Sequence, residues 1–233
     1  LGVMKEHLHC RASAGLFDVS HMGQVVIWPN SGAFADAAEA FEKLVPVDVM
    51  GLKPNRQRYA MFTNESGGIM DDLMIANLGD HLFVVPNAGC KAEDIAHMRA
   101  HLSDTCRVEV ITDRALLALQ GPKAEAVLSD AGFDVADMNF MTGVEPDTGW
   151  FLSRTGYTGE DGFEIAMPEK ETEKFARKLL ADDRVEFIGL GARDSLRLEA
   201  GLSLYGQDLD ENPSPHEAGL SWAIHKALRE GGT

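Results

Sequence analysis

Short runs in which apolar and polar residues alternate recur along the chain, a pattern typical of β-strands. One pair of runs is separated by Gly79-Asp80, a dipeptide that favours a tight hairpin turn. The pattern therefore predicts several antiparallel strands. They are expected at residues 24–28, 59–63, 70–78, 81–85, 108–111, 116–119, 151–154 and 163–167.

Other stretches place apolar residues three or four positions apart, which is the spacing of one helix face. Ser31 is a suitable N-cap for the first of these helices, and Pro46 ends it. Ile95, Met98 and Leu102 form the apolar face of another helix. The helices are expected at residues 31–45, 91–102, 122–131, 168–181 and 190–200.

The predicted strands and helices alternate irregularly, and hairpins join several of the strands. This order favours an α+β fold of antiparallel sheet with packed helices over a doubly wound parallel sheet. A chain of 233 residues is long enough for two small domains. The basic, proline-containing loop 53–56 is a natural boundary between them.

Composition narrows the possible partners. Hydrophobic residues make up 45% of the chain and charged residues 25%, as in ordinary globular proteins. The formal net charge of −16 disfavours nucleic acid and anionic membranes as partners. No apolar run approaches the roughly 20 residues that span a bilayer. The start of the sequence lacks the apolar region and the cleavage site of a signal peptide. Because the sequence does not begin with Met and no terminating element is expected at its end, we expect it to be part of a longer polypeptide.

Cysteine usage points to a reducing compartment. Cys10, Cys90 and Cys106 are too few and too scattered for a disulfide framework, and no two of them form a Cys-x-x-Cys pair. Lys91 follows Cys90 and would favour a thiolate there, but no histidine lies nearby in the sequence to activate it as a nucleophile.

The most informative segment is glycine-rich, with Gly156, Gly159 and Gly162 at intervals of three. Glycine there allows the backbone to approach a ligand closely or to adopt positive φ. The strand that follows would hold Glu164 on one face and Phe163 on the other. Alternatively, Glu164 is simply an ordinary acid on a half-exposed strand.

A second cluster, residues 192–201, predicts a helix that presents Arg193 and Arg197 one turn apart and ends at Gly201. A carboxylate such as Glu164 near a guanidinium would recognise a ligand with both donors and acceptors. The alternative is that both arginines are solvated and pair weakly with neighbouring acids.

Asp71 and Asp72 lie at the start of an otherwise apolar strand. Neighbouring strand residues point to opposite faces, so the two carboxylates are not expected to form a facing dyad. A buried carboxylate is costly unless it is paired, which makes the inward acid a candidate for function. Alternatively, both acids merely decorate the strand entry.

Other patterns carry less information. His97 and His101 are four residues apart, but no glutamate follows His97 and no third ligand is placed, so no metal site is expected. The glycine-rich segment is neither a dinucleotide fingerprint nor a phosphate loop, because the required strand–glycine–helix context is missing. Ser20-His21 lacks a nucleophile elbow.

Six motifs occur in the same order as in one known family. The chain resembles, nearly throughout, the aminomethyltransferases of the glycine cleavage system, or T-proteins. The motifs lie at residues 17–22, 63–73, 85–90, 116–122, 153–165 and 192–208.

This resemblance implies a discontinuous folate-binding domain (1–50 and 139–233) and an inserted α+β domain (51–138) that carries the catalytic aspartate. It also implies that the family's C-terminal β-barrel domain lies outside this chain. The catalytic residue would be Asp72, and Glu164 and Arg193 would bind folate. Further cofactor-binding positions implied by the resemblance are Met22, Tyr59, Phe83, Val84, Asn87 and Tyr157.

The implied reaction releases ammonia from the aminomethyl group on a lipoyl carrier protein, the H-protein, and forms 5,10-methylenetetrahydrofolate. Tetrahydrofolate is then the one-carbon acceptor, and no metal takes part. The implied location is the cytoplasm, or the mitochondrial matrix in a eukaryote. A folate-dependent demethylase, or the folate half of a dimethylglycine- or sarcosine-oxidising protein, shares the fold. A non-catalytic folate-binding iron–sulfur assembly factor also shares it, but its Lys-Gly-Cys motif is absent here.

Overall fold

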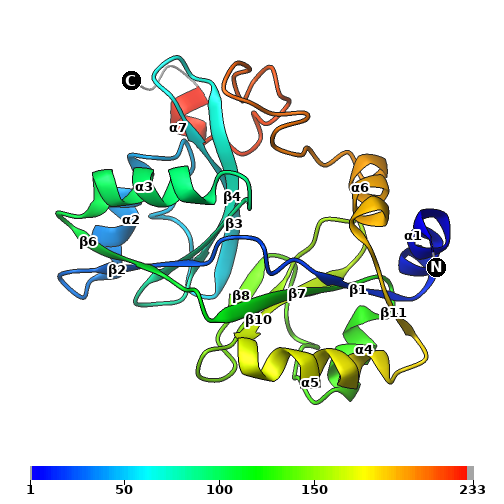
Figure 1. Cartoon of the computed structure of the whole chain (residues 1–233). Coiled ribbons are helices and arrows are strands. Elements are labelled where there is room, and N and C mark those ends of the chain that lie inside the picture. The colour runs from blue at the N-terminus through cyan, green and yellow to red at the C-terminus, as the bar shows by residue number, and fades with distance from the viewer. Residues whose placement is uncertain (1, 230–233) are drawn as a thin grey trace. The chain divides into compact units, whose positions relative to one another are not determined.

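The computed structural model describes residues 2–229, which fold into two compact units (Figure 1). Unit 1 combines Leu1–His21 with Asp113–Leu202. Unit 2 combines Met22–Thr112 with Ser203–Thr233. Each unit contains antiparallel strands and helices, so the prediction of two interleaved α+β units is confirmed.

Unit 1 is built on a sheet with the strand order β11-β1-β7-β10-β9-β8. The pair β1–β11 is parallel and the other neighbours are antiparallel. The strands are β1 (Ala14–Asp18), β7 (Arg114–Gln120), β8 (Thr142–Val144), β9 (Phe151–Arg154), β10 (Gly162–Pro168) and β11 (Val185–Phe187).

The helices of unit 1 are α1 (Val3–Ala12), α4 (Ala124–Asp130), α5 (Glu169–Leu180) and α6 (Leu190–Glu199). In Figure 1, α4 and α5 lie together beside β10. Buried residues of these helices, including Leu128 and Leu179, form one apolar cluster with Phe163 and Ile165 of β10. This packing leaves the opposite face of β10 for Glu164.

Unit 2 has a fully antiparallel sheet with the order β3-β4-β5-β2-β6. The β3–β4 register shifts between Phe62 and Thr63. The strands are β2 (Val25–Pro29), β3 (Arg56–Thr63), β4 (Ile69–Asn77), β5 (Leu82–Pro86) and β6 (Cys106–Val110).

The two faces of this sheet are covered differently. Helices α2 (Phe34–Glu42) and α3 (Lys91–Leu102) lie on one side, where they enclose the main apolar core (Figure 1). A smaller cluster on β3 and β4 is covered by Leu209 and Leu220 of the C-terminal segment. That segment includes α7 (Lys226–Arg229).

The units change at other points of the chain than the predicted domain boundaries near residues 50 and 138. Strand β2 pairs with β5 and β6 and so belongs to unit 2, although it lies before residue 50. Strand β7 pairs with β1 and β10 and so belongs to unit 1, although it lies before residue 138.

Most predicted elements are present, and the helix at 91–102 is matched at both ends. Ser31 is not an N-cap as predicted: α2 begins at Phe34, and the Ser31 hydroxyl instead accepts the Ala33 N–H at 3.1 Å. Pro122 lies outside α4, which begins at Ala124. Helices α1 and α7 and strands β1, β8 and β11 were not predicted.

Candidate functional site

The neighbouring aspartates of β4 face opposite sides of the sheet, as predicted. Asp71 is fully buried and lies on the same side as Leu73 and Ile75, whose side chains belong to the core beneath the helices. Asp72 is only partly buried and lies on the other side. The inward acid, which the residue pattern alone favoured for function, is therefore Asp71, whereas the resemblance points to Asp72.

Two side chains hold the carboxylate of Asp72. The Tyr59 hydroxyl donates to Oδ2 at 2.9 Å, and the Asn87 amide donates to Oδ1 at 2.7 Å. Tyr59 in turn stacks on Trp222, with ring centroids 5.4 Å apart. Burial, and secondarily the nearby charge of Asp71, raises the pKa of Asp72 to about 6, although the two hydrogen bonds oppose the rise.

Asn87 connects the two aspartates. Its backbone N–H and its side-chain amide each donate to Asp71 at 3.0 Å, and the same amide nitrogen reaches Asp72. Asp71 also shares side-chain hydrogen bonds with Asp94 and Cys90. Tyr59, Asn87 and Asp72, which the resemblance grouped as site residues, are thus brought together within unit 2.

Three other site residues that the resemblance implies also belong to unit 2. Val84 is fully buried in the main core. Phe83 is 1% exposed, and as the preceding residue of β5 it points to the opposite side. Only one of these two side chains can therefore face a ligand on a given side of the sheet. Met22 is partly buried at the first position of unit 2.

Within unit 1, a second charged group centres on Glu164 of β10 and Arg193 of α6. The guanidinium carbon of Arg193 lies 4.7 Å from the centroid of the Tyr157 ring, a cation–π distance. Burial raises the pKa of Glu164, and the positive charge of Arg193 opposes this rise. Burial also lowers the pKa of Arg193.

Arg193 retains binding capacity. Its Nη1 atom is buried and has no hydrogen-bond partner among the residues that the structure describes. A buried donor without an acceptor is costly, by about 1–3 kcal/mol. Glu164, Arg193 and Tyr157 therefore form a group that an external acceptor would complete.

The glycine-rich loop is shaped by a buried glutamine. A Cβ on Gly156 would lie 1.6 Å from Gln120 Oε1, so glycine is required there for close packing. The Gln120 amide donates to Thr155 O at 2.8 Å and is fully buried. Gly159 adopts φ of +80°. The close approach at Gly156 is thus to Gln120 and not to a ligand, as the spacing of the glycines had suggested.

Arg197 differs from the solvated arginine that was considered for it. It is 2% exposed, and it donates to Asp194 at 2.9 Å and to the Leu202 carbonyl at 3.1 Å. These bonds fix the end of α6, so Arg197 supports the helix that carries Arg193.

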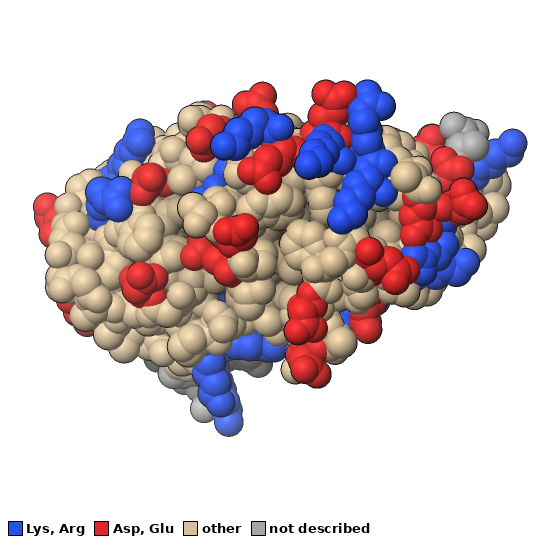
Figure 2. Space-filling model, turned by 90° about the horizontal axis from the view of Figure 1, so that it is seen from below, with Lys and Arg blue, Asp and Glu red and all other residues tan. Residues whose placement is uncertain are grey.

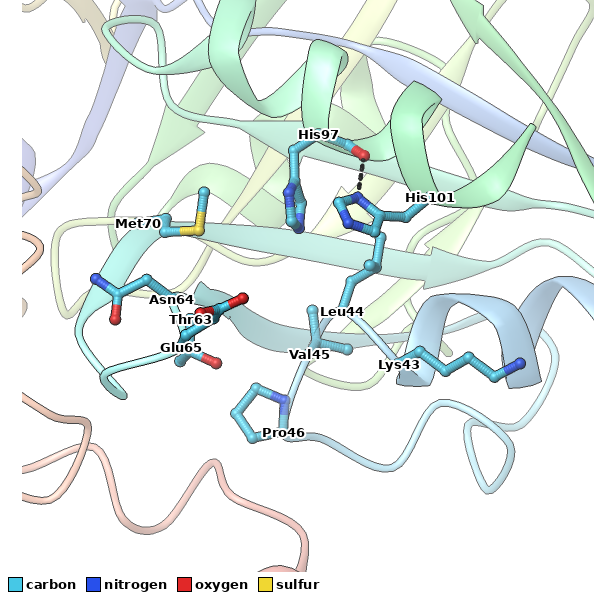
Figure 3. Close-up of a pocket in the computed structure, with 10 residues that line it drawn as sticks. All are labelled: Lys43, Leu44, Val45, Pro46, Thr63, Asn64, Glu65, Met70, His97 and His101. Carbon is cyan, nitrogen blue, oxygen red and sulfur yellow. Dashed lines mark hydrogen bonds between the residues drawn. The ribbon is translucent and has the colours of Figure 1, made fainter. Parts of the chain in front are cut away.

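A separate pocket of about 550 Å³ opens in unit 2 (Figure 3). His97 and His101 project into it from α3, and Glu65 lies across from them (Figure 3). His101 Nδ1 donates to the carbonyl of His97 at 2.9 Å. Within the described residues, no group of three His, Cys, Asp or Glu side chains is arranged to hold a metal. The pocket contains none of the predicted site residues.

The surface carries charged side chains of both signs (Figure 2). Figure 2 shows basic and acidic side chains interspersed over the face it draws, without a patch of one sign. In residues 2–229, no helix is both long and apolar enough to cross a membrane.

Sequence reasoning missed the roles of Asp94, Trp222 and Gln120. Asp94 had a usable signal: it lies four residues before Met98, on the predicted apolar face of α3, where an acid is unexpected. Trp222 and Gln120 had none, because their partners Tyr59 and Thr155 are distant in the sequence.

Comparison with known proteins decides the family. The model of the GCVT N-terminal domain matches residues 1–227. The chain belongs to the GCVT N-terminal domain family. Among its curated relatives, the mitochondrial aminomethyltransferase of Dictyostelium discoideum is 44% identical to this chain. The match covers 99% of this chain and 61% of that protein. That of Mus musculus is 44% identical over 96% of this chain and 57% of its own.

Solved structures agree. The glycine cleavage system aminomethyltransferase T of Bartonella henselae has a TM-score of 0.94 and 47% identity, over 99% of this chain and 63% of that one. A heterotetrameric sarcosine oxidase from Corynebacterium sp. U-96 has a TM-score of 0.53 at 18% identity, which shows a shared fold. The present chain thus spans about three fifths of the length of these curated relatives.

Proposed function

We propose that this chain is the part of a glycine cleavage system aminomethyltransferase that binds tetrahydrofolate and carries the catalytic aspartate. The observation that carries the proposal is the environment of Asp72, a partly exposed carboxylate held by Tyr59 and Asn87. The names of the curated relatives and the high identity to them support the choice of reaction.

The reaction transfers one carbon between two carriers. The methylene carbon of the aminomethyl group loses its bonds to sulfur and to nitrogen and gains bonds to two nitrogens of tetrahydrofolate. The two N–H protons of the folate are taken up by the released thiol and ammonia, so atoms and charge balance. The residues of this chain must therefore bind folate, move protons and stabilise developing positive charge.

We assign the chemical step to Asp72. A carboxylate with a pKa of about 6 is mostly ionised at neutral pH. In that form it stabilises positive charge on the transferring carbon and can accept a proton from a folate nitrogen. Tyr59 and Asn87 fix its orientation, so that no reorganisation is needed when charge develops.

We assign folate recognition to Glu164 and Arg193. The amino group and ring N–H of a reduced pterin lie side by side, and one carboxylate accepts both. The unpartnered Nη1 of Arg193 supplies a donor for an acceptor on the ligand. Further side-chain contacts are proposed for Met22, Phe83 and Tyr157, whereas Val84, whose side chain is buried in the main core, is left with its backbone alone for such a contact.

The proposed carrier of the aminomethyl group is the lipoyl H-protein, because the proposed system delivers its substrate on that carrier. Curated relatives are named as mitochondrial. We accordingly propose the mitochondrial matrix if the source is eukaryotic and the cytoplasm otherwise. The likeness to sarcosine oxidase is one of fold alone and does not favour an oxidative role.

The direct test mixes the complete protein with aminomethylated lipoyl carrier and tetrahydrofolate. We expect ammonia and 5,10-methylenetetrahydrofolate in equal amounts, and no methylenetetrahydrofolate when folate is omitted. Asp80→Asn, which changes an exposed acid at the β4–β5 turn, is the control for substitutions of Asp72. Folate-dependent demethylation of a methylated substrate, without ammonia release from the carrier, would contradict the proposal.

A further inference from the structure

Three carboxyl groups lie next to one another in unit 2, and the proposed mechanism uses only Asp72. The other two are deeply buried: Asp71 is 0% exposed and Asp94, in the first turn of α3, is 2% exposed. Two isolated buried carboxylates would be prohibitively costly. The cluster must therefore hold a proton or an unusually complete set of donors.

The hydrogen bonds identify where the proton lies. Asp71 accepts the backbone N–H and the side-chain amide of Asn87, which requires lone pairs on both of its oxygens. Asp94 shares a side-chain hydrogen bond with Asp71. Two carboxyl groups form such a bond only when one carries a proton. The two Asn87 donors favour the ionised form of Asp71, whereas Asp94 Oδ2 is buried and receives no hydrogen bond from a donor among residues 2–229, so the proton belongs on Asp94.

We propose that Asp94 is a positioning residue that stays a neutral carboxylic acid and donates its proton to Asp71, thereby holding Asn87 and Asp72 in the reactive arrangement. This inference rests on the catalytic role proposed for Asp72. Asp71 anchors Asn87 through two bonds, and the same Asn87 amide donates to Asp72 Oδ1 at 2.7 Å. Asp94 thus acts on Asp72 through Asp71 and Asn87.

The groups around Asp94 favour its neutral form. Burial, and then Asp71, Glu93 and Asp72, raise its pKa well above the usual range. Opposing them is the N-terminus of α3, which favours negative charge. Nearby Cys90 and Tyr205 also have raised pKa values, so they remain uncharged, and the Tyr205 hydroxyl donates to the Ile69 carbonyl.

This arrangement limits the charge beside Asp72. With Asp94 neutral, the buried pair carries one negative charge instead of two. The second charge would further disfavour the carboxylate form of Asp72 on which the proposed chemistry depends. It would also repel Asp71 and loosen the bonds that hold Asn87.

The test compares Asp94→Asn with Asp94→Ala in the complete protein, with Glu93→Gln as the control from the same helical turn. The asparagine amide can replace the donated hydrogen bond, whereas alanine cannot. We expect kcat of Asp94→Asn within about threefold of wild type, and kcat of Asp94→Ala lower by about 10- to 100-fold with little change in the folate KM. Equal kcat in the two Asp94 variants would overturn the proposal.

A second readout is independent of turnover. At neutral pH, infrared spectroscopy should detect a buried protonated carboxyl group in wild type and Glu93→Gln that is absent from Asp94→Asn. Persistence of this signal in Asp94→Asn would overturn the inference. If Asp72→Asn retained full turnover, the catalytic assignment would fail instead, while the infrared signal would still report on Asp94.

Stability against pH supplies a third check, which needs no alanine variant. A raised pKa in the folded state contributes stability below the unfolded pKa of about 4, and this contribution is lost as pH rises. The urea midpoint should therefore fall less between pH 5 and pH 8 in Asp94→Asn than in wild type or Glu93→Gln. An identical fall in all three proteins would contradict a proton on Asp94.

Discussion

The acidic cluster of unit 2 and the charged pair of unit 1 accommodate buried charge in different ways. In unit 2, Asp71 and Asp72 are each held by donors from the protein itself, and Asn87 serves both. In unit 1, Arg193 keeps a buried nitrogen that has no hydrogen-bond partner within residues 2–229. A group already held by its neighbours suits a reaction step that requires fixed geometry. A group with spare donors suits recognition, because the ligand completes it.

The largest expected effect is a loss of turnover when Asp72, in the acidic cluster of unit 2, is substituted. Asp72→Asn keeps the size of the side chain and removes its charge, so turnover should fall by about 10²- to 10⁴-fold. Steady-state kinetics with the carrier substrate measures the loss, and Asp80→Asn should be near wild type. If turnover of Asp72→Asn stayed within threefold of wild type, Asp72 would not be the catalytic residue.

For the charged pair of unit 1, we expect substitutions to weaken the binding of folate. Arg193→Met retains most of the apolar stem but lacks the donors, and folate should bind about 10- to 100-fold more weakly. Equilibrium titration with tetrahydrofolate measures this, and Arg177→Met on exposed α5 is the matched control. Unchanged affinity would remove Arg193 from the proposed binding group.

A substitution at Gly156 tests whether the tight packing of the glycine-rich loop stabilises unit 1. Gly156→Ala places a Cβ against Gln120, and the free energy of unfolding should fall by about 1–3 kcal/mol. Urea denaturation gives the value. Gly89→Ala has open space around the new Cβ and should change stability much less. Equal stability of the two variants would show that the loop adjusts freely.

The smallest effect concerns the hydrogen bond from Tyr59 to Asp72. The active carboxylate is populated above its pKa of about 6, so activity should decline as pH falls through that value. Tyr59→Phe removes a bond that lowers this pKa, and the acidic limb of the rate profile should move to higher pH by up to about one unit. A shift of this limb to lower pH would mean that the Tyr59 hydrogen bond does not stabilise the ionised form of Asp72.

The sequence predicted the local structure well where one pattern dominated. The apolar face at Ile95, Met98 and Leu102 placed α3, and the alternation around Glu164 placed β10. The unit boundaries escaped prediction because they depend on strand pairing: β2 joins β5 and β6, partners that follow it by more than 50 residues.

The candidate site was predicted only in part, for a similar reason. Alternation along β4 placed Asp71 and Asp72 on opposite faces but did not say which one faced the core. That choice depends on α3, which covers one side of the sheet and brings Asp94 to Asp71. The folate-binding roles proposed for Glu164 and Arg193 came from family resemblance, because each alone is an ordinary charged residue on a strand or helix.

The division of labour between the two groups is tested most directly by measuring folate affinity and single-turnover rate in Asp72→Asn and Glu164→Gln. The account predicts that Asp72→Asn binds tetrahydrofolate with near wild-type affinity but reacts at least about 100-fold more slowly. Glu164→Gln should bind about 10- to 100-fold more weakly and, once saturated, react at a rate much closer to wild type. Equal losses of affinity in the two variants, with similar rates at saturation, would contradict it.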